Sequence, residues 1–81
     1  FIIGPLLIYK YGEECVKKFR AQFPEKPLLV KAQILERPAE SVALFAKAGA
    51  TWVSVLAGAG NEAIHTASTI ARNNNTKIIL D

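Results

Sequence analysis

Four short apolar runs recur along the chain, and a segment with helical spacing follows each of the first three. The runs centre near Ile2, Leu29, Val53 and Ile78, about 25 residues apart. A strand, a helix and a second strand at this spacing form a βαβ unit, because parallel neighbours need a long crossover connection. The pattern therefore predicts an α/β fold, a parallel βαβαβαβ segment of four strands and three helices.

Proline, glycine and asparagine mark the ends of these predicted elements. The predicted strands cover 1–4, 28–33, 52–56 and 77–80, and residues 6–11 are expected to form only a short helical turn. The first helix is predicted over 12–23, and the second runs from Pro38 at its first position to a left-handed cap at Gly49. The third is expected to be capped by Asn61 and to end at the asparagine triplet 73–75.

The composition fits a single α/β unit over residues 1–81. Hydrophobic residues make up 51% of the chain, and no apolar run reaches the roughly 18 residues that a membrane helix needs. A single cysteine, Cys15, allows no internal disulfide, so we expect the cytoplasm or another reducing compartment. Cys15 on an apolar stripe and the isolated His65 are expected to be a core thiol and a surface residue, and we expect no metal ligands.

The formal charge of +3 comes from basic residues that are scattered over the chain. The cluster of Lys17, Lys18 and Arg20 lies late in the first helix, and Glu13 and Glu14 lie at its start. We interpret the cluster as a solvated helix face with two Glu–Lys pairs four residues apart. Without aromatic residues between the basic ones, it does not predict nucleic-acid binding, and no membrane partner is expected.

The glycine-containing segment from Gly58 to Ala63 resembles the G-x-G-x-x-A dinucleotide fingerprint. It follows a predicted strand and opens a helix, and Asp81 ends the next strand, where a ribose-binding acid would lie. Gly58, Gly60 and Asp81 are therefore candidate cofactor-binding residues. A simple tight turn is the favoured interpretation of the glycines, and an anion resting on the helix N-terminus is a third one.

Several short motifs, taken in order, resemble one enzyme family over nearly the whole chain. They are Gly4–Pro5–Leu6, Tyr11–Gly12, Phe23–Pro24–Glu25–Lys26, Ala48–Gly49–Ala50, Val53–Ser54–Val55–Leu56, Ala59, Ala63–Ile64, Ala67, Ala71–Arg72 and Asp81. In these residues the chain is similar to the 3-hexulose-6-phosphate synthase and 3-keto-L-gulonate-6-phosphate decarboxylase branch of the orotidine-5'-phosphate decarboxylase superfamily. The resemblance implies about half of a (β/α)₈ TIM barrel, its second to fifth strands.

The family's diagnostic motif, Asp-x-Lys-x-x-Asp at the end of the third barrel strand, is substituted here. The corresponding positions are Lys31, Gln33 and Glu36, so only the last keeps a carboxylate. A lysine repels the divalent metal that an aspartate would bind, and an amide does not exchange protons near neutral pH. Lys31 and Glu36 could instead pair with each other or meet a partner chain. We expect no cofactor, or Mg²⁺ if the family activity survives.

Three hypotheses for function follow. The chain has no methionine and opens inside a predicted strand, which we interpret as a fragment, and a four-stranded parallel sheet has two edges that need partners. The leading hypothesis is a non-catalytic, degenerate or truncated barrel segment that self-associates or joins a larger assembly through these edges. The second is a magnesium-dependent sugar-phosphate lyase, an aldolase or decarboxylase, completed by missing segments or a partner chain. The third is a dinucleotide- or phosphate-binding module at Gly58–Gly60.

Overall fold

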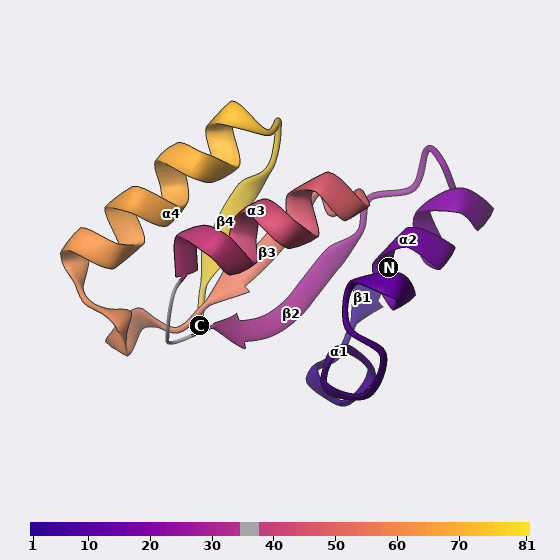
Figure 1. The fold of residues 1–81 in the computed structure, drawn as a ribbon, viewed down its shortest axis with the longest axis horizontal. Coiled ribbons are helices and arrows are strands. Elements are labelled where there is room, and N and C mark those ends of the chain that lie inside the picture. Colours follow the sequence, from indigo (N-terminus) through magenta and orange to yellow (C-terminus); the bar gives the residue numbers. More distant parts are fainter. Residues whose placement is uncertain (35–37) are drawn as a thin grey trace.

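The computed structural model describes residues 1–34 and 38–81, and its strands form one parallel sheet (Figure 1). The strands are β1 (Ile2–Ile3), β2 (Leu29–Ile34), β3 (Trp52–Val55) and β4 (Lys77–Leu80). The helices are α1 (Pro5–Tyr11), α2 (Glu13–Gln22), α3 (Pro38–Ala48) and α4 (Asn61–Asn73), with a short 3₁₀ helix, η1 (Ala57–Ala59), before α4. The predicted α/β class and the four parallel strands are confirmed.

The sheet order is β1-β2-β3-β4, so each strand pairs with the next one along the chain. One row of paired residues crosses the whole sheet, Ile3, Val30, Val53 and Ile78. Between Val30 and Ile34 the register of β2 against β3 shifts, because β2 uses more residues than β3 over the same distance. The order leaves β1 and β4 as the two edges among the described strands.

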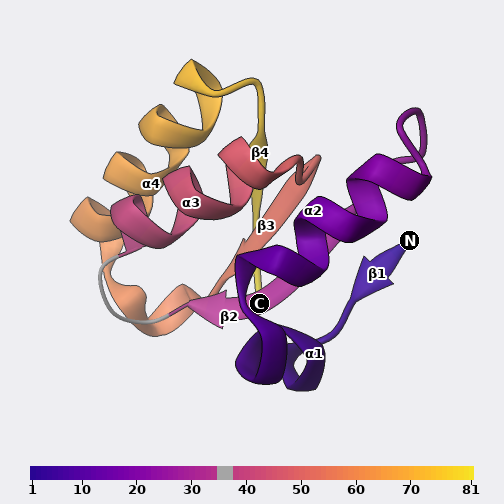
Figure 2. The same cartoon turned by 45° about the vertical axis from the view of Figure 1, so that its right-hand side comes forward.

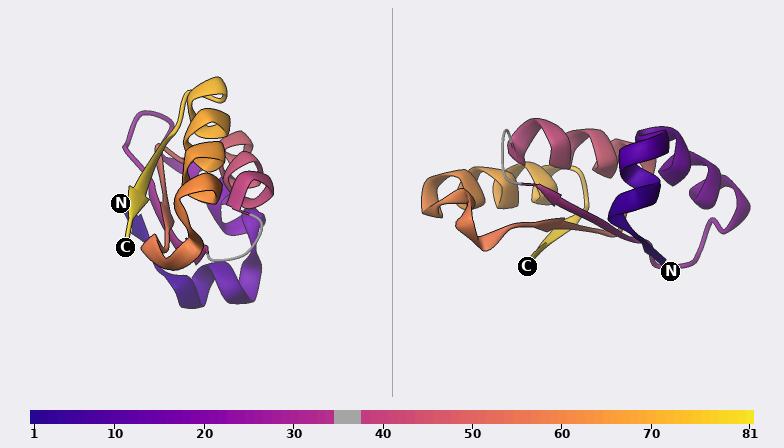
Figure 3. Two further views of the ribbon diagram at one scale, coloured as in Figure 1. Left: turned by 90° about the vertical axis from the view of Figure 1, so that its left-hand side faces the viewer. Right: turned by 90° about the horizontal axis from the view of Figure 1, so that it is seen from below.

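The helices α2, α3 and α4 lie on one side of the sheet (Figure 3, right). On that side Val30, Val53 and Val55 have no exposed surface, and Ile3 keeps 1%. The helices meet them with small or branched residues that let helix and sheet approach closely, namely Val16, Val42, Ala67 and Ala71. This layer is the core of the protein, and we call this side of the sheet the covered face.

The other side, which we call the open face, carries the alternate residues of the same strands. Ile2 is 69% exposed, Ile79 and Lys77 are exposed, and Leu29 and Trp52 are half-buried. Ser54, the shortest side chain there, is buried. Because successive strand residues point to opposite faces, each strand contributes to both sides.

The N-terminal end of the chain is anchored by aromatic packing. The ring of Phe1 lies 4.6 Å from Phe23 and 6.2 Å from Phe19, measured between ring centroids. The Phe1 amino group donates a hydrogen bond of 2.8 Å to the carbonyl of Pro27. These contacts fix β1 against α2, and Figure 2 shows β1 as an outer strand beside that helix.

Three sequence-based expectations differ from the structure. The region around 6–11 is a full helix, α1, so the described residues form four α-helices rather than three, since Pro5 starts a helix readily at its first position. Asn61 is the first residue of α4 and not its cap, which is Gly60 at φ +97°. Lys17 contacts both Glu13 (3.7 Å) and Glu14 (3.5 Å), so the predicted Glu13–Lys17 pair is present while Glu14 contacts Lys17 instead of Lys18.

Two other expectations agree with the structure. Asn75 closes the turn after α4 at φ +58°, and Gly49 ends α3 at φ +116°.

In the described part of the chain, no helix has both the length and the apolar character needed to cross a membrane.

Candidate functional site

In parallel α/β folds the chemistry lies on the loops that follow the carboxyl ends of the strands. Two of the three residues at the substituted motif positions are on β2: Lys31 within the strand and Gln33 near its end. The structure describes only the backbone at Gln33, and Glu36 lies outside the described residues. The predicted pairing of Lys31 with Glu36 therefore stays a prediction.

Lys31 lies on the open face of the sheet. Its two neighbours in β2, Val30 and Ala32, belong to the hydrophobic core on the covered face, so the lysine between them points the other way. It is half-buried. In a sheet that closes into a barrel the open face becomes the barrel interior, so Lys31 would bring a cation inside.

Backbone hydrogen bonds hold the glycine loop after β3 in place. Ala57–Ala59 forms η1, and the amide of Ala57 donates to the carbonyl of Asp81 at 2.9 Å, while Asp81 donates to Val55 at 2.9 Å. These bonds continue the β3–β4 ladder by one residue and place exposed Asp81 beside the start of the loop. The glycine loop and Asp81 therefore lie at the same end of the sheet.

The geometry of Gly60 leaves room beside the loop. Its φ of +97° is a conformation that L side chains rarely adopt, and a Cβ built there meets nothing within 4 Å. A tight turn alone accounts for the positive φ. Dinucleotide sites of open sheets lie where the strand order reverses, and the described strands run 1-2-3-4 without reversal. The fold therefore favours the turn interpretation.

The described residues do not offer a Mg²⁺ site. No group of three or more His, Cys, Asp or Glu side chains is placed to hold a metal among residues 1–34 and 38–81. Magnesium prefers carboxylate and water oxygens, whereas the first motif position here is the ammonium of Lys31. The donor set does not fit the metal that the family resemblance implies.

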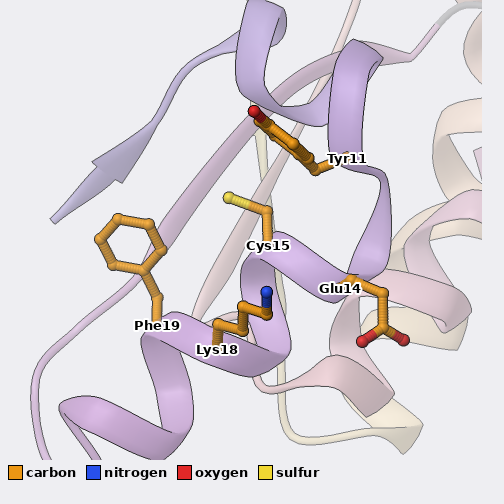
Figure 4. Close-up of a pocket in the computed structure, with 5 residues that line it drawn as sticks. All are labelled: Tyr11, Glu14, Cys15, Lys18 and Phe19. Carbon is orange, nitrogen blue, oxygen red and sulfur yellow. The ribbon is translucent and has the colours of Figure 1, made fainter.

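Two hollows of the structure are lined by neither Lys31 nor the glycine loop. A cavity of about 350 Å³ is lined by Tyr11, Glu14, Cys15, Lys18 and Phe19, from the end of α1 and the first two turns of α2. In Figure 4 the rings of Tyr11 and Phe19 lie on either side of the Cys15 thiol, and the Glu14 carboxylate points away from them. Cys15 is a free, buried cysteine, as expected. This cavity is a mainly apolar gap between α1 and α2, and neither Lys31 nor the glycine loop lines it.

A second, more polar hollow of about 550 Å³ lies at the opposite end of β4. It is lined by Ser68, Arg72, Asn75, Thr76, Lys77 and Ile78. Thr76 is buried there, and its hydroxyl donates to the carbonyl of Ala50 at 2.9 Å, so the floor of the hollow is part of the turn that joins α4 to the sheet. This is the amino end of β4, where parallel α/β folds place stability rather than chemistry.

Arg20 has a structural role that the sequence pattern did not indicate. Its Nε and Nη2 donate to the carbonyl of Gly49 at 2.9 and 2.8 Å, and its Nη1 donates to the carbonyls of Phe23, Pro24 and Lys26 at 2.8 to 3.1 Å. It is half-buried, so its assignment to a solvated helix face is wrong. The planar guanidinium carries five donors in a fixed fork, and here they join two loops at the amino end of the sheet.

No family model and no curated protein matches the chain. Solved structures do. KGPDC from Streptococcus mutans in complex with D-R5P has a TM-score of 0.93 at 20% identity, covering 98% of this chain and 38% of that one. 3-Hexulose-6-phosphate synthase from Salmonella typhimurium gives 0.94 at 22% identity, covering 99% and 38%. 3-Keto-L-gulonate-6-phosphate decarboxylase from Vibrio cholerae gives 0.94 at 24% identity, covering 98% and 37%.

These similarities show the fold of the chain. It is a segment of a TIM barrel, and it spans less than two fifths of the length of these similar chains. The structures carry the names of the family that the sequence motifs resemble, so the resemblance is confirmed at the level of the fold.

Proposed function

We propose that this chain is a non-catalytic barrel segment of the hexulose-phosphate synthase type, with a role in structure and assembly. The observation that carries the proposal is the position of Lys31, a half-buried cation on the open face of β2 where the resembled family has an aspartate. A positive charge at this point opposes metal binding by simple repulsion. Gln33, in place of the family's lysine, has no titratable proton to deliver to a carbanion-like intermediate.

The assembly part of the proposal is supported by the two edges of the sheet. Exposed apolar residues lie at both edges, namely Ile2 (69%) in β1, Phe1 (53%) just before it and Leu80 (52%) in β4. Unpaired backbone groups along an edge strand favour pairing with another strand. A partner strand at either edge would cover these side chains and extend the sheet, either from another copy or from a larger assembly.

The test is an assay of aldol cleavage and decarboxylation with hexulose 6-phosphate substrates and Mg²⁺. The wild-type chain is expected to give no turnover above a buffer blank and no Mg²⁺ binding heat by calorimetry. The double variant Lys31→Asp, Gln33→Lys restores the family residues at both positions and is the matched comparison. Turnover by the wild-type chain that is lost in Lys31→Ala would overturn the proposal.

A sugar-phosphate lyase completed by further strands is the second candidate. It is favoured by the partial coverage, since the chain matches only 37 to 39% of the similar chains and the remainder would supply the other barrel strands. Glu36 also keeps an acid at the last motif position. If this candidate is right, turnover should appear when the missing strands are supplied, and Glu36→Gln should abolish it.

A nucleotide- or phosphate-binding module is the third candidate, and the open space beside Gly60 favours it. The expected result for a plain turn is no saturable NAD binding by fluorescence titration. Micromolar binding that disappears in Gly60→Val and in Asp81→Asn would favour the nucleotide module instead.

A further inference from the structure

We draw no further inference here: the strongest candidate, the exposed apolar surface that Leu6, Leu7, Tyr9 and Tyr11 form on α1, is a helix face for which nothing in the structure shows what covers it.

Discussion

The two faces of the sheet are made from neighbouring residues of the same strands. On the covered face Ile3 is 1% exposed, whereas Ile2, one position earlier, is 69% exposed on the open face. Val30 is fully buried, while Leu29 beside it is half-buried. The helices pack on the covered face, and we therefore expect the open face to contribute less to the stability of the fold. The comparison separates residues that the helices cover from residues that the helices leave exposed.

A large effect is expected from removing the hydrogen bonds that the Arg20 guanidinium donates to two loops at the amino end of the sheet. Arg20→Ala leaves the carbonyls of Gly49 and Lys26 without their donor, and we expect a loss of about 3 kcal/mol in the free energy of unfolding. For a chain of this size, that corresponds to a fall in Tm of about 15 °C. Thermal unfolding followed by circular dichroism measures it.

Lys18→Ala is the matched control for that substitution, since it removes an exposed cation from the same helix. Its effect should stay below about 0.5 kcal/mol. Arg20→Lys should recover little of the stability, because one ammonium group cannot reproduce the planar fork of the guanidinium. Equal effects of Arg20→Ala and Lys18→Ala would contradict the structural role of Arg20.

A smaller effect is expected from truncating adjacent residues of β2. Val30→Ala removes two buried methyl groups from the core and should cost about 2 kcal/mol. Leu29→Ala removes more atoms but from the open face, and we expect less than about 1 kcal/mol. Urea unfolding of both variants measures the difference. A larger loss of stability in Leu29→Ala than in Val30→Ala would mean that the open face is already packed.

Most of the fold could be predicted from the sequence because its signals are local. The apolar runs gave the four strands, Pro38 gave the start of α3, and Gly49 and Asn75 gave the turns that their positive φ requires. α1 was underestimated because its residues carry no buried stripe, and none of them is buried in the structure. Only Ile8 of this helix is half-buried against the core, and a single such position defines no period.

The candidate site and the hydrogen bonds of Arg20 were harder to predict, because they depend on contacts between distant parts of the chain. Arg20 reaches Gly49, 29 residues away along the chain, and a contact of this range leaves no trace in local charge spacing. Gly49 offered an indirect signal, since a Cβ there would lie 2.7 Å from the Arg20 side chain. Strand alternation indicates the face of the sheet on which Lys31 lies. Only the structure shows that the helices all cover the other face.

The smallest effect, and the sharpest test of the comparison, comes from the edge strand β1. Ile2→Ser replaces an exposed apolar side chain on the open face, so we expect a change of less than about 0.5 kcal/mol in the free energy of unfolding. The same substitution one residue later, Ile3→Ser, places a hydroxyl in the core and should cost about 3 kcal/mol or more. Chemical unfolding of the pair measures both changes under one condition. A large loss of monomer stability in Ile2→Ser would show that the open face takes part in folding.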